Sequence, residues 1–137
     1  MIYLFDTNAI ADLMNDHPAM VAQVRAHQRE DVLGLCQPVD YEVWRGLRWR
    51  TAAGQLQLYI NRIRPQFEWI PLIDEDWRQA AQFWAETRRA GKQLSDVDLL
   101  LAALAYRLNA VIVTNDDDFG ALTVRHENWR HLSNTSE

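Results

Sequence analysis

The sequence contains a single cysteine, Cys36, and only five glycines and four prolines. One cysteine excludes both a disulfide framework and a cysteine-based zinc site. The longest apolar run, residues 99–106, is far shorter than the roughly 20 residues of a membrane-spanning helix. The apolar N-terminal segment Ile2–Phe5 has no basic stretch before it, which argues against a signal peptide. We therefore expect a cytoplasmic protein without a membrane segment.

Lysine is almost absent as well. Thirteen of the fourteen basic residues are arginine, and Lys92 is the one lysine. The formal net charge of −5 argues against a simple nucleic-acid-binding surface. Arginine, however, forms forked hydrogen bonds with phosphates and carboxylates that lysine cannot form. The net charge can therefore hide an acidic site within a partly basic surface.

One arginine cluster lies among tryptophans and is a candidate contact surface. Arginine and aromatic side chains together suit an RNA backbone or an acidic partner. A solvated helix face with dimer contacts is an equally weighted interpretation. The cluster consists of Arg45, Arg48 and Arg50, flanked by Trp44 and Trp49.

What is present indicates one α/β domain over residues 1–137, because short apolar runs alternate with helical stretches. We expect a central, mainly parallel sheet of four or five strands. The expected strands are residues 2–5, 32–36, 68–72 and 110–113, with a final edge element at 120–124. The expected helices are residues 7–14, 18–29, 39–50, 55–63, 75–89 and 95–108. On the fifth helix, Trp77 and Trp84 are seven residues apart and are expected to pack inward.

Acidic residues follow these strands. Asp6 comes directly after the first strand, and Asp116, Asp117 and Asp118 follow the strand at 110–113. In a parallel sheet, residues just beyond the carboxyl ends of the strands line one crevice. Two helix starts add further acids to the pattern, at Glu42, Asp96 and Asp98. Carboxylates gathered in this way repel one another unless a cation is present, and oxygen-rich sites suit Mg²⁺ or Mn²⁺.

Each acid also has a simpler interpretation when it is taken alone. Asp6 suits the N-cap of the following helix, and the segment from Ser95 to Asp98 resembles a capping box. Glu42 fits a solvated helix face, and the run of three aspartates fits a polar turn. The metal-site hypothesis gains weight because the acids of all four segments are expected to face the same crevice, beyond the carboxyl ends of the strands.

Four motifs occur in a fixed order along the chain. They are Asp6-Thr7-Asn8 after the first strand, Glu42-Val43-Trp44-Arg45-Gly46, Asp98-Leu99-Leu100-Leu101-Ala102-Ala103, and Val113-Thr114-Asn115-Asp116-Asp117-Asp118-Phe119. In this order they resemble the successive motifs of PIN-domain ribonucleases. The chain length and residues 122–129 resemble the VapC toxins of VapBC toxin–antitoxin pairs.

The resemblance implies a three-layer α/β/α fold and Mg²⁺- or Mn²⁺-dependent endoribonuclease activity. It also implies a homodimer and inhibition by a VapB-type antitoxin. Structured RNA, such as transfer or ribosomal RNA, is the substrate class that the resemblance suggests.

Residue by residue, the resemblance assigns a catalytic, metal-binding acidic quartet. Asp98 fits better than Asp96 because it stands immediately before the leucine run. Asp118 remains a further candidate metal ligand beside Asp116, and Asn8 and Thr114 match supporting polar positions. The quartet consists of Asp6, Glu42, Asp98 and Asp116.

Two other functions remain as alternatives. A catalytically inactive PIN-like domain would only bind a partner. A phosphatase with an aspartyl nucleophile would also place Asp6 after the first strand, but it needs a general acid two residues later, where this chain has Asn8.

Overall fold

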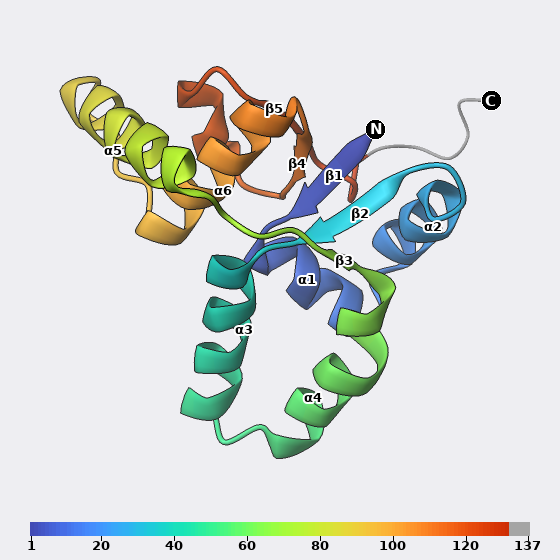
Figure 1. Ribbon diagram of the computed structural model, residues 1–137. Coiled ribbons are helices and arrows are strands. Elements are labelled where there is room, and N and C mark those ends of the chain that lie inside the picture. The colour runs from blue at the N-terminus through green and yellow to red at the C-terminus, as the bar shows by residue number, and fades with distance from the viewer. Residues whose placement is uncertain (132–137) are drawn as a thin grey trace.

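A computed structural model describes residues 1–131 and contains a five-stranded sheet in the order β3-β2-β1-β4-β5 (Figure 1). Each of the four strand pairs is parallel, as the sequence predicts. Leu4 in the central strand is in register with Gly34 on one side and Ile112 on the other. The strands are β1 Ile2–Phe5, β2 Val32–Leu35, β3 Glu68–Trp69, β4 Val111–Val113 and β5 Arg125–Glu127.

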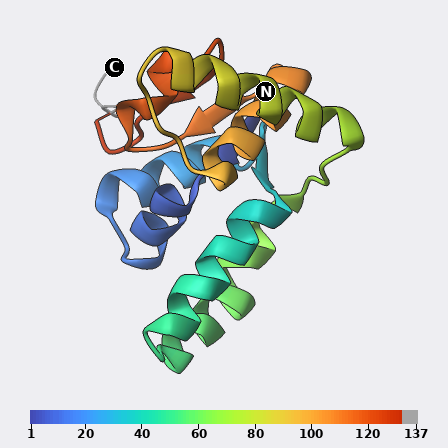
Figure 2. The ribbon, with the colours of Figure 1, turned by 90° about the vertical axis from the view of Figure 1, so that its left-hand side faces the viewer.

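Helices cover both faces of this sheet, which gives the three layers of an α/β/α fold (Figures 1 and 2). The first four helices lie on one side, and α5 and α6 lie on the other. The third and fourth helices extend away from the sheet as an arm (Figure 2). The helices are α1 Thr7–Met14, α2 Pro18–His27, α3 Gln37–Trp49, α4 Ala53–Leu58, α5 Asp74–Arg89 and α6 Asp96–Leu108. Shorter turns are the π-helical η1 Tyr59–Ile63 and the 3₁₀ turns η2 Arg64–Gln66 and η3 Asp117–Ala121.

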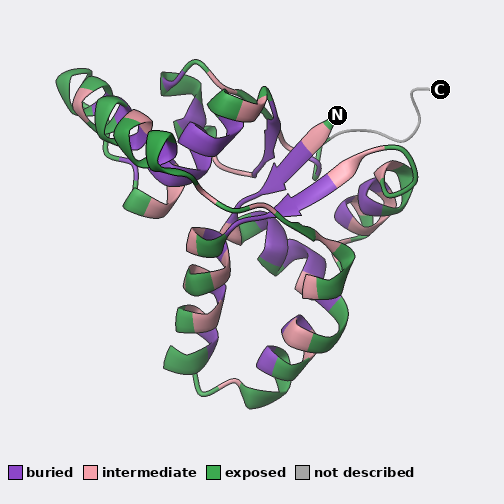
Figure 3. Ribbon diagram, in the orientation of Figure 1, coloured by how far each residue is buried: buried purple, intermediate pink, exposed green. Residues whose placement is uncertain are grey.

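The inner strands form the core because their side chains are apolar on both faces (Figure 3). The segment after β5 completes this core. Trp129 is fully buried, stacks on His27 with ring centroids 4.6 Å apart, and meets Tyr3 and Phe5 edge-on. Its indole N–H donates to a Glu127 carboxylate oxygen at 2.9 Å. Burying this large aromatic side chain fixes the end of the described chain against the central strand.

The expected edge element at residues 120–124 is wrong. Gly120 and Ala121 belong to η3, and the edge strand β5 comes later, at Arg125–Glu127. Its exposed polar side chains give no apolar signal, and its place is set by the parallel ladder, in which the Thr114 N–H donates to the Glu127 carbonyl at 3.0 Å. The strand expected at 68–72 is similarly shortened to Glu68–Trp69.

The expectation that Trp77 and Trp84 pack inward is also wrong, since they are 59% and 44% exposed. The inner face of α5 carries Asp76, Ala80, Phe83 and Thr87. Asp76 is accommodated there because it pairs with Arg107 of α6, at 2.8 and 3.0 Å, and Thr87 because its hydroxyl donates to the Phe83 carbonyl. Polar residues with internal partners thus occupy the inner positions, and the indoles lie outside.

None of the helices within residues 1–131 is long and apolar enough to cross a membrane.

Candidate active site

Acidic side chains meet where β1 and β4 end. Asp6 follows β1, and its N–H donates to the carbonyl of Val113, the last residue of β4, at 3.1 Å. Asp116 lies three residues beyond Val113. Glu42 of α3 and Asp98 of α6 belong to the same cluster, because the charges of Asp6, Glu42 and Asp116 all raise the pKa of Asp98. The structure therefore brings all four predicted acids within electrostatic reach of one another.

Asp6 is the most deeply buried of these acids, at 3% exposure. One carboxylate oxygen caps α1 by accepting from the Ala9 N–H at 2.8 Å, and the side chain is also hydrogen-bonded to Thr114. Burial nevertheless raises the pKa of Asp6 to about 6, helped by the charges of Asp116 and Glu42 and opposed by the two hydrogen bonds. Asp6 is therefore both a helix cap and a member of the cluster.

Glu42 lies in the second turn of α3, and both of its carboxylate oxygens have partners. The Thr7 hydroxyl donates to Oε1, and Arg45 donates to Oε2 at 3.2 Å. Thr7 lies inside the Asp6-Thr7-Asn8 motif, but sequence reasoning gave it no role. The structure shows that Thr7 joins the first motif to the second.

Asp98 lies in the first turn of α6, where Ser95 provides the cap. The Ser95 hydroxyl oxygen accepts from the Asp98 N–H at 3.1 Å. Burial, together with the charges of Asp6 and Glu42, raises the pKa of Asp98 to about 7, and a hydrogen bond between the Asp98 and Ser95 side chains opposes the shift. A carboxyl group held near half ionisation at neutral pH is typical of a functional site.

A single hydroxyl group links Asp6 and Asp116. Thr114 is buried; its side chain is hydrogen-bonded to Asp6, and its oxygen accepts from the Asp116 N–H at 2.9 Å. Asp116 in turn caps η3 by accepting from the Asp118 N–H at 2.9 Å. Asp118 itself is exposed.

A hollow of about 170 Å³ between α1 and α3 adjoins the acids. Thr7 and Glu42 contribute to its wall, together with apolar side chains such as Ile10 and Met14. The exposed Asn8 and Arg50 also line it, so an amide group and a cation share the hollow with the Glu42 carboxylate.

The three arginines of the predicted cluster differ in their surroundings. Arg45 pairs with Glu42 and lies over the Tyr41 ring, 5.1 Å from its centroid. Arg48 lies over the Trp44 ring at 5.6 Å, and Arg50 lines the same hollow as Glu42. Arg45 therefore contacts the candidate site directly through Glu42, and Arg50 reaches it only along the hollow.

Asp12 is a supporting residue that sequence reasoning missed. It is 6% exposed, and Arg130 binds both of its carboxylate oxygens, at 2.5 and 2.6 Å. The Asn115 amide also donates to it at 3.3 Å. Asp12 thus ties α1 to the loop that carries Asp116 and to the end of the described chain. Its position six residues after Asp6 gave no signal, because its partners are distant in sequence.

The donor chemistry of the cluster fits a hard divalent cation. Among residues 1–131, no three His, Cys, Asp or Glu side chains are placed to hold one ion between them. Mg²⁺ needs only one or two protein carboxylates, since it keeps several waters and takes further oxygens from substrate phosphates. Buried carboxylates with raised pKa values are the expected state of such a set before a cation neutralises their repulsion.

Comparison with known proteins bears on the family and on the fold. The family model described as PIN domain matches residues 3–124. Ribonuclease VapC11 from Mycobacterium tuberculosis is 30% identical over 123 residues, which cover 87% of this chain and 90% of that protein. Among solved structures, VapBC from Salmonella typhimurium gives a TM-score of 0.82 at 18% identity, covering 94% of this chain and 98% of that chain. VapBC2 from Rickettsia felis gives a TM-score of 0.79 at 23% identity, and the match covers 94% of this chain and 99% of that chain.

The chain belongs to the PIN-domain family. Within it, the chain is of the VapC type, since a VapC protein matches it over nearly its whole length. The solved structures, at lower identity, show the same fold.

Burial of Asp6 and Asp98, together with repulsion within the cluster, predicts how stability depends on pH. Asp6 and Asp98 titrate near pH 6 and 7 in the folded chain, against about 4 when unfolded. Their ionised forms are disfavoured by folding, so the metal-free protein should lose stability as pH rises from about 4 to 7. We expect the Asp98→Asn protein to lose less stability than wild type over this pH range. At pH 8 it should be at least as stable as wild type, measured by thermal melts in chelator.

Added Mg²⁺ or Mn²⁺ should then stabilise the wild type more than Asp98→Asn, because a ligand stabilises only the state that binds it. Asp96→Asn is the matched control, since Asp96 is an exposed carboxylate in the same helical turn. If Asp98→Asn is destabilised equally with and without metal, Asp98 serves only the helix start.

Proposed function

We propose that this protein is a Mg²⁺- or Mn²⁺-dependent endoribonuclease that acts as the toxin of a VapBC-type toxin–antitoxin pair. The observation that carries the proposal is the convergence of Asp6, Glu42, Asp98 and Asp116, from four separate segments, at one sheet edge of a PIN-domain protein. Its relative VapC11 is named a ribonuclease.

Asp6, Asp98 and Asp116 are the ligands that we propose for the cation, with Asp118 as a further candidate at the exposed side of the site. One or two of them would bind the ion directly, and its coordinated waters would reach the others. When bound, Mg²⁺ or Mn²⁺ lowers the pKa of a coordinated water and offsets the charge of a phosphodiester. Water would attack phosphorus in line while the bond from phosphorus to the leaving oxygen breaks, without a covalent protein intermediate. A bound cation would favour the ionised forms of Asp6 and Asp98, so any proton that either carboxyl group still carries would pass to solvent on binding.

The other residues of the site keep these carboxylates in place. Thr114 fixes Asp6 relative to Asp116, and Thr7 and Arg45 fix Glu42 at the edge of the cluster. The exposed Asn8 adjoins the hollow and would hold water or a phosphate oxygen. Preorganised polar groups of this kind avoid reorganisation during the reaction.

RNA would approach along the arginine-bearing face of α3. Arg50 lines the hollow and Arg45 binds Glu42, so both can meet phosphates close to the acids, while Arg48 extends the basic face. Structured RNA, such as transfer or ribosomal RNA, is the substrate class that we propose.

A VapB-type antitoxin would inhibit the enzyme, and the protein would act in the cytoplasm as a homodimer. Several of the solved structures with this fold are complexes with an antitoxin. An arginine from such a partner could enter the carboxylate cluster in place of the cation, because its fork suits paired carboxylates.

RNA cleavage tests the nuclease directly. Purified protein should cleave RNA only with Mg²⁺ or Mn²⁺, and Asp6→Asn or Asp98→Asn should reduce the rate by at least about a hundredfold, since each removes charge from the cluster. Asp117→Asn is the matched control, because Asp117 is an exposed acid in the same run. Sequencing of the RNA ends identifies the target. Cleavage that survives chelation, or a hydroxylamine-labile phosphoenzyme, would contradict the proposal.

Salt dependence tests the arginine face. Each phosphate contact on single-stranded RNA contributes about 0.7 to the slope of log affinity against log salt. Replacing Arg45, Arg48 and Arg50 together by Gln should lower that slope by up to about 2. RNA binding is measured by fluorescence anisotropy in the Asp98→Asn background, in which the RNA is not cleaved. The exposed Arg78 of α5 provides a control as Arg78→Gln. An unchanged slope in the triple variant would place the RNA elsewhere.

Growth tests the biological role. Expression of the wild-type chain should arrest bacterial growth, and co-expression of a small antitoxin encoded next to it should restore growth. Asp98→Asn should be tolerated at the same expression level, because it lacks the acid on which cleavage depends. Tolerance of the wild type at high level, without any partner, would refute the toxin assignment.

A further inference from the structure

Aromatic and arginine side chains lie side by side on the exposed side of α3. The buried side of this helix is formed by Val39, Val43 and Leu47. The exposed side chains fall at i, i+4, i+7 and i+8, which is the spacing of a single helix face. We call this surface the outer face of α3. It consists of Tyr41, Arg45, Arg48 and Trp49.

The aromatic side chains of the outer face are open to solvent. Trp49 is 86% exposed, the highest value for a large hydrophobic side chain within residues 1–131. Tyr41 is also exposed, and the Arg45 guanidinium lies over its ring. Flat apolar surfaces and cations therefore adjoin one another, and leaving the Trp49 indole in water is unfavourable unless something covers it.

The outer face is positively charged, although the chain as a whole is negative. Arg48 and the neighbouring Arg50 form no ion pair within 4.0 Å in the part of the chain that the structure describes. Arg45 pairs with Glu42, whose other carboxylate oxygen accepts from the Thr7 hydroxyl. A polyanion therefore meets cations here that lack an internal partner.

We propose that unpaired RNA bases stack on Trp49 and Tyr41, while Arg45 and Arg48 bind the phosphates between them. This inference rests on the proposed nuclease function and names the nucleotides that the outer face recognises. Proteins that bind single strands combine exposed aromatic rings with cations along the backbone in this way. Bases within a duplex are covered on both faces by their neighbours, so the unpaired nucleotides of a structured RNA are the ones that would bind here.

The outer face leads to the acid cluster. Glu42 and Trp49 are seven residues apart, so they lie on nearly the same side of α3, about 10 Å apart along its axis. Arg45 lies between them in the sequence and binds Glu42. The helix runs from the sheet edge out along the arm (Figure 2). A base on Trp49 would therefore belong to a nucleotide near the cleaved phosphate and would help to hold that phosphate at the acids.

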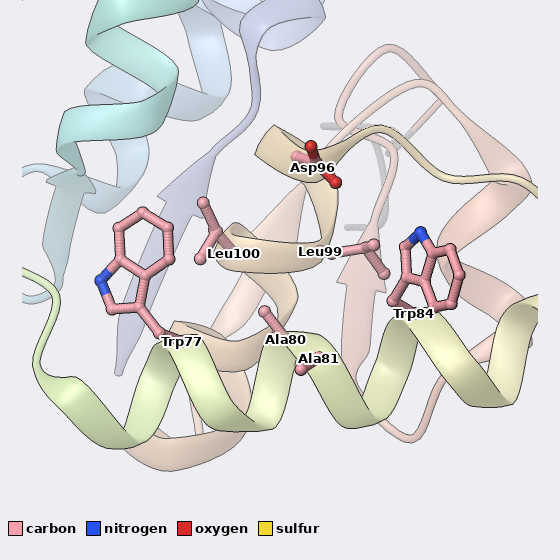
Figure 4. Close-up of a pocket in the computed structure, with 7 residues that line it drawn as sticks. All are labelled: Trp77, Ala80, Ala81, Trp84, Asp96, Leu99 and Leu100. Carbon is pink, nitrogen blue, oxygen red and sulfur yellow. The ribbon is translucent and has the colours of Figure 1, made fainter.

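A second exposed aromatic surface, on α5, lacks these features. Trp77 and Trp84 stand at the two ends of a notch of about 280 Å³ between α5 and α6 (Figure 4). The described residues that line it include the Asp96 carboxylate and no basic side chain, so the notch repels a phosphate. Because Arg88 lies over the Trp84 ring, Trp77 is the better control for an exposed indole.

Fluorescence anisotropy with a short, labelled single-stranded RNA of mixed sequence tests the stacking, in the Asp98→Asn background. Trp49→Leu should weaken binding at least about fivefold, because it removes one stacking surface. Trp49→Phe should keep most of the affinity, and Tyr41→Leu should weaken binding in the same way as Trp49→Leu. Trp77→Leu should leave binding unchanged. Position 49 is exposed, so the fold should persist, which circular dichroism checks.

Changes in the RNA separate stacking from phosphate contacts. The same strand with abasic residues keeps its phosphates, and the strand annealed to its complement hides the faces of its bases. With either probe, Trp49→Leu should bind as tightly as its parent protein. Trp49→Leu should also leave the slope of log affinity against log salt unchanged for the single strand, whereas loss of the arginines lowers it.

Equal binding of the single strand by Trp49→Leu and its parent would overturn the proposal. A loss that is just as large with the abasic or the duplex probe would do so as well. The proposal also fails if Trp49→Leu loses antitoxin binding or self-association while its affinity for RNA is unchanged, because another protein would then cover the outer face.

Binding and cleavage are measured separately, so the two proposals fail separately. Trp49-dependent binding of single strands by a protein whose wild type cleaves no RNA would keep the stacking surface and reject the nuclease. Metal-dependent cleavage by the wild type, with binding that is insensitive to Trp49→Leu, would do the reverse.

Discussion

Repulsion between carboxylates at one edge of a parallel sheet is the constraint on which the rest of the structure depends. Parallel strands end on the same side, so Asp6 and Asp116 lie close together as soon as β1 pairs with β4. Glu42 and Asp98 are added by helices that begin at this same edge. The chain offsets part of the cost with a helix cap, the Thr114 hydroxyl, Thr7 and Arg45. Burial first, and the remaining repulsion second, raise the pKa values of Asp6 and Asp98.

Other buried acids in the chain are treated differently, and the contrast is informative. Asp12 and Asp76 are as inaccessible as Asp6, yet each binds an arginine through two hydrogen bonds. Those pairs join elements, α1 to the end of the described chain and α5 to α6. A buried carboxylate that serves structure thus has its own cation here. Asp6 has hydroxyl and amide donors, which hold it in place without neutralising it.

Much of this could be predicted from the sequence, because periodicity and position carry local information. Apolar runs predict β1 and β4, and the acids after them predict the cluster. The preference for Asp98 over Asp96 rests on the resemblance to PIN-domain motifs and stays a prediction. The wrong and missed predictions have one cause, which is that the positions of the residues concerned depend on partners distant in sequence. Trp77 and Trp84 are exposed because Asp76, paired with Arg107, occupies the inner face of α5. The polar sequence of β5 does not predict a strand, and only its pairing with β4 defines it. Asp12 is identified only by Arg130 and Asn115. The roles of the acids remain predictions that the cleavage and stability measurements test.

The late position of two acids and of Trp129 has a consequence for synthesis of the protein. Asp98 and Asp116 lie in the final third of the chain, and the indole that packs against Tyr3 and Phe5 comes still later. A growing polypeptide on the ribosome therefore cannot assemble the four-carboxylate cluster until residue 116 has been added, long after β1, β2 and α3 have been made. Synthesis of the first half of the domain thus gives a chain in which only two of the four acids are present.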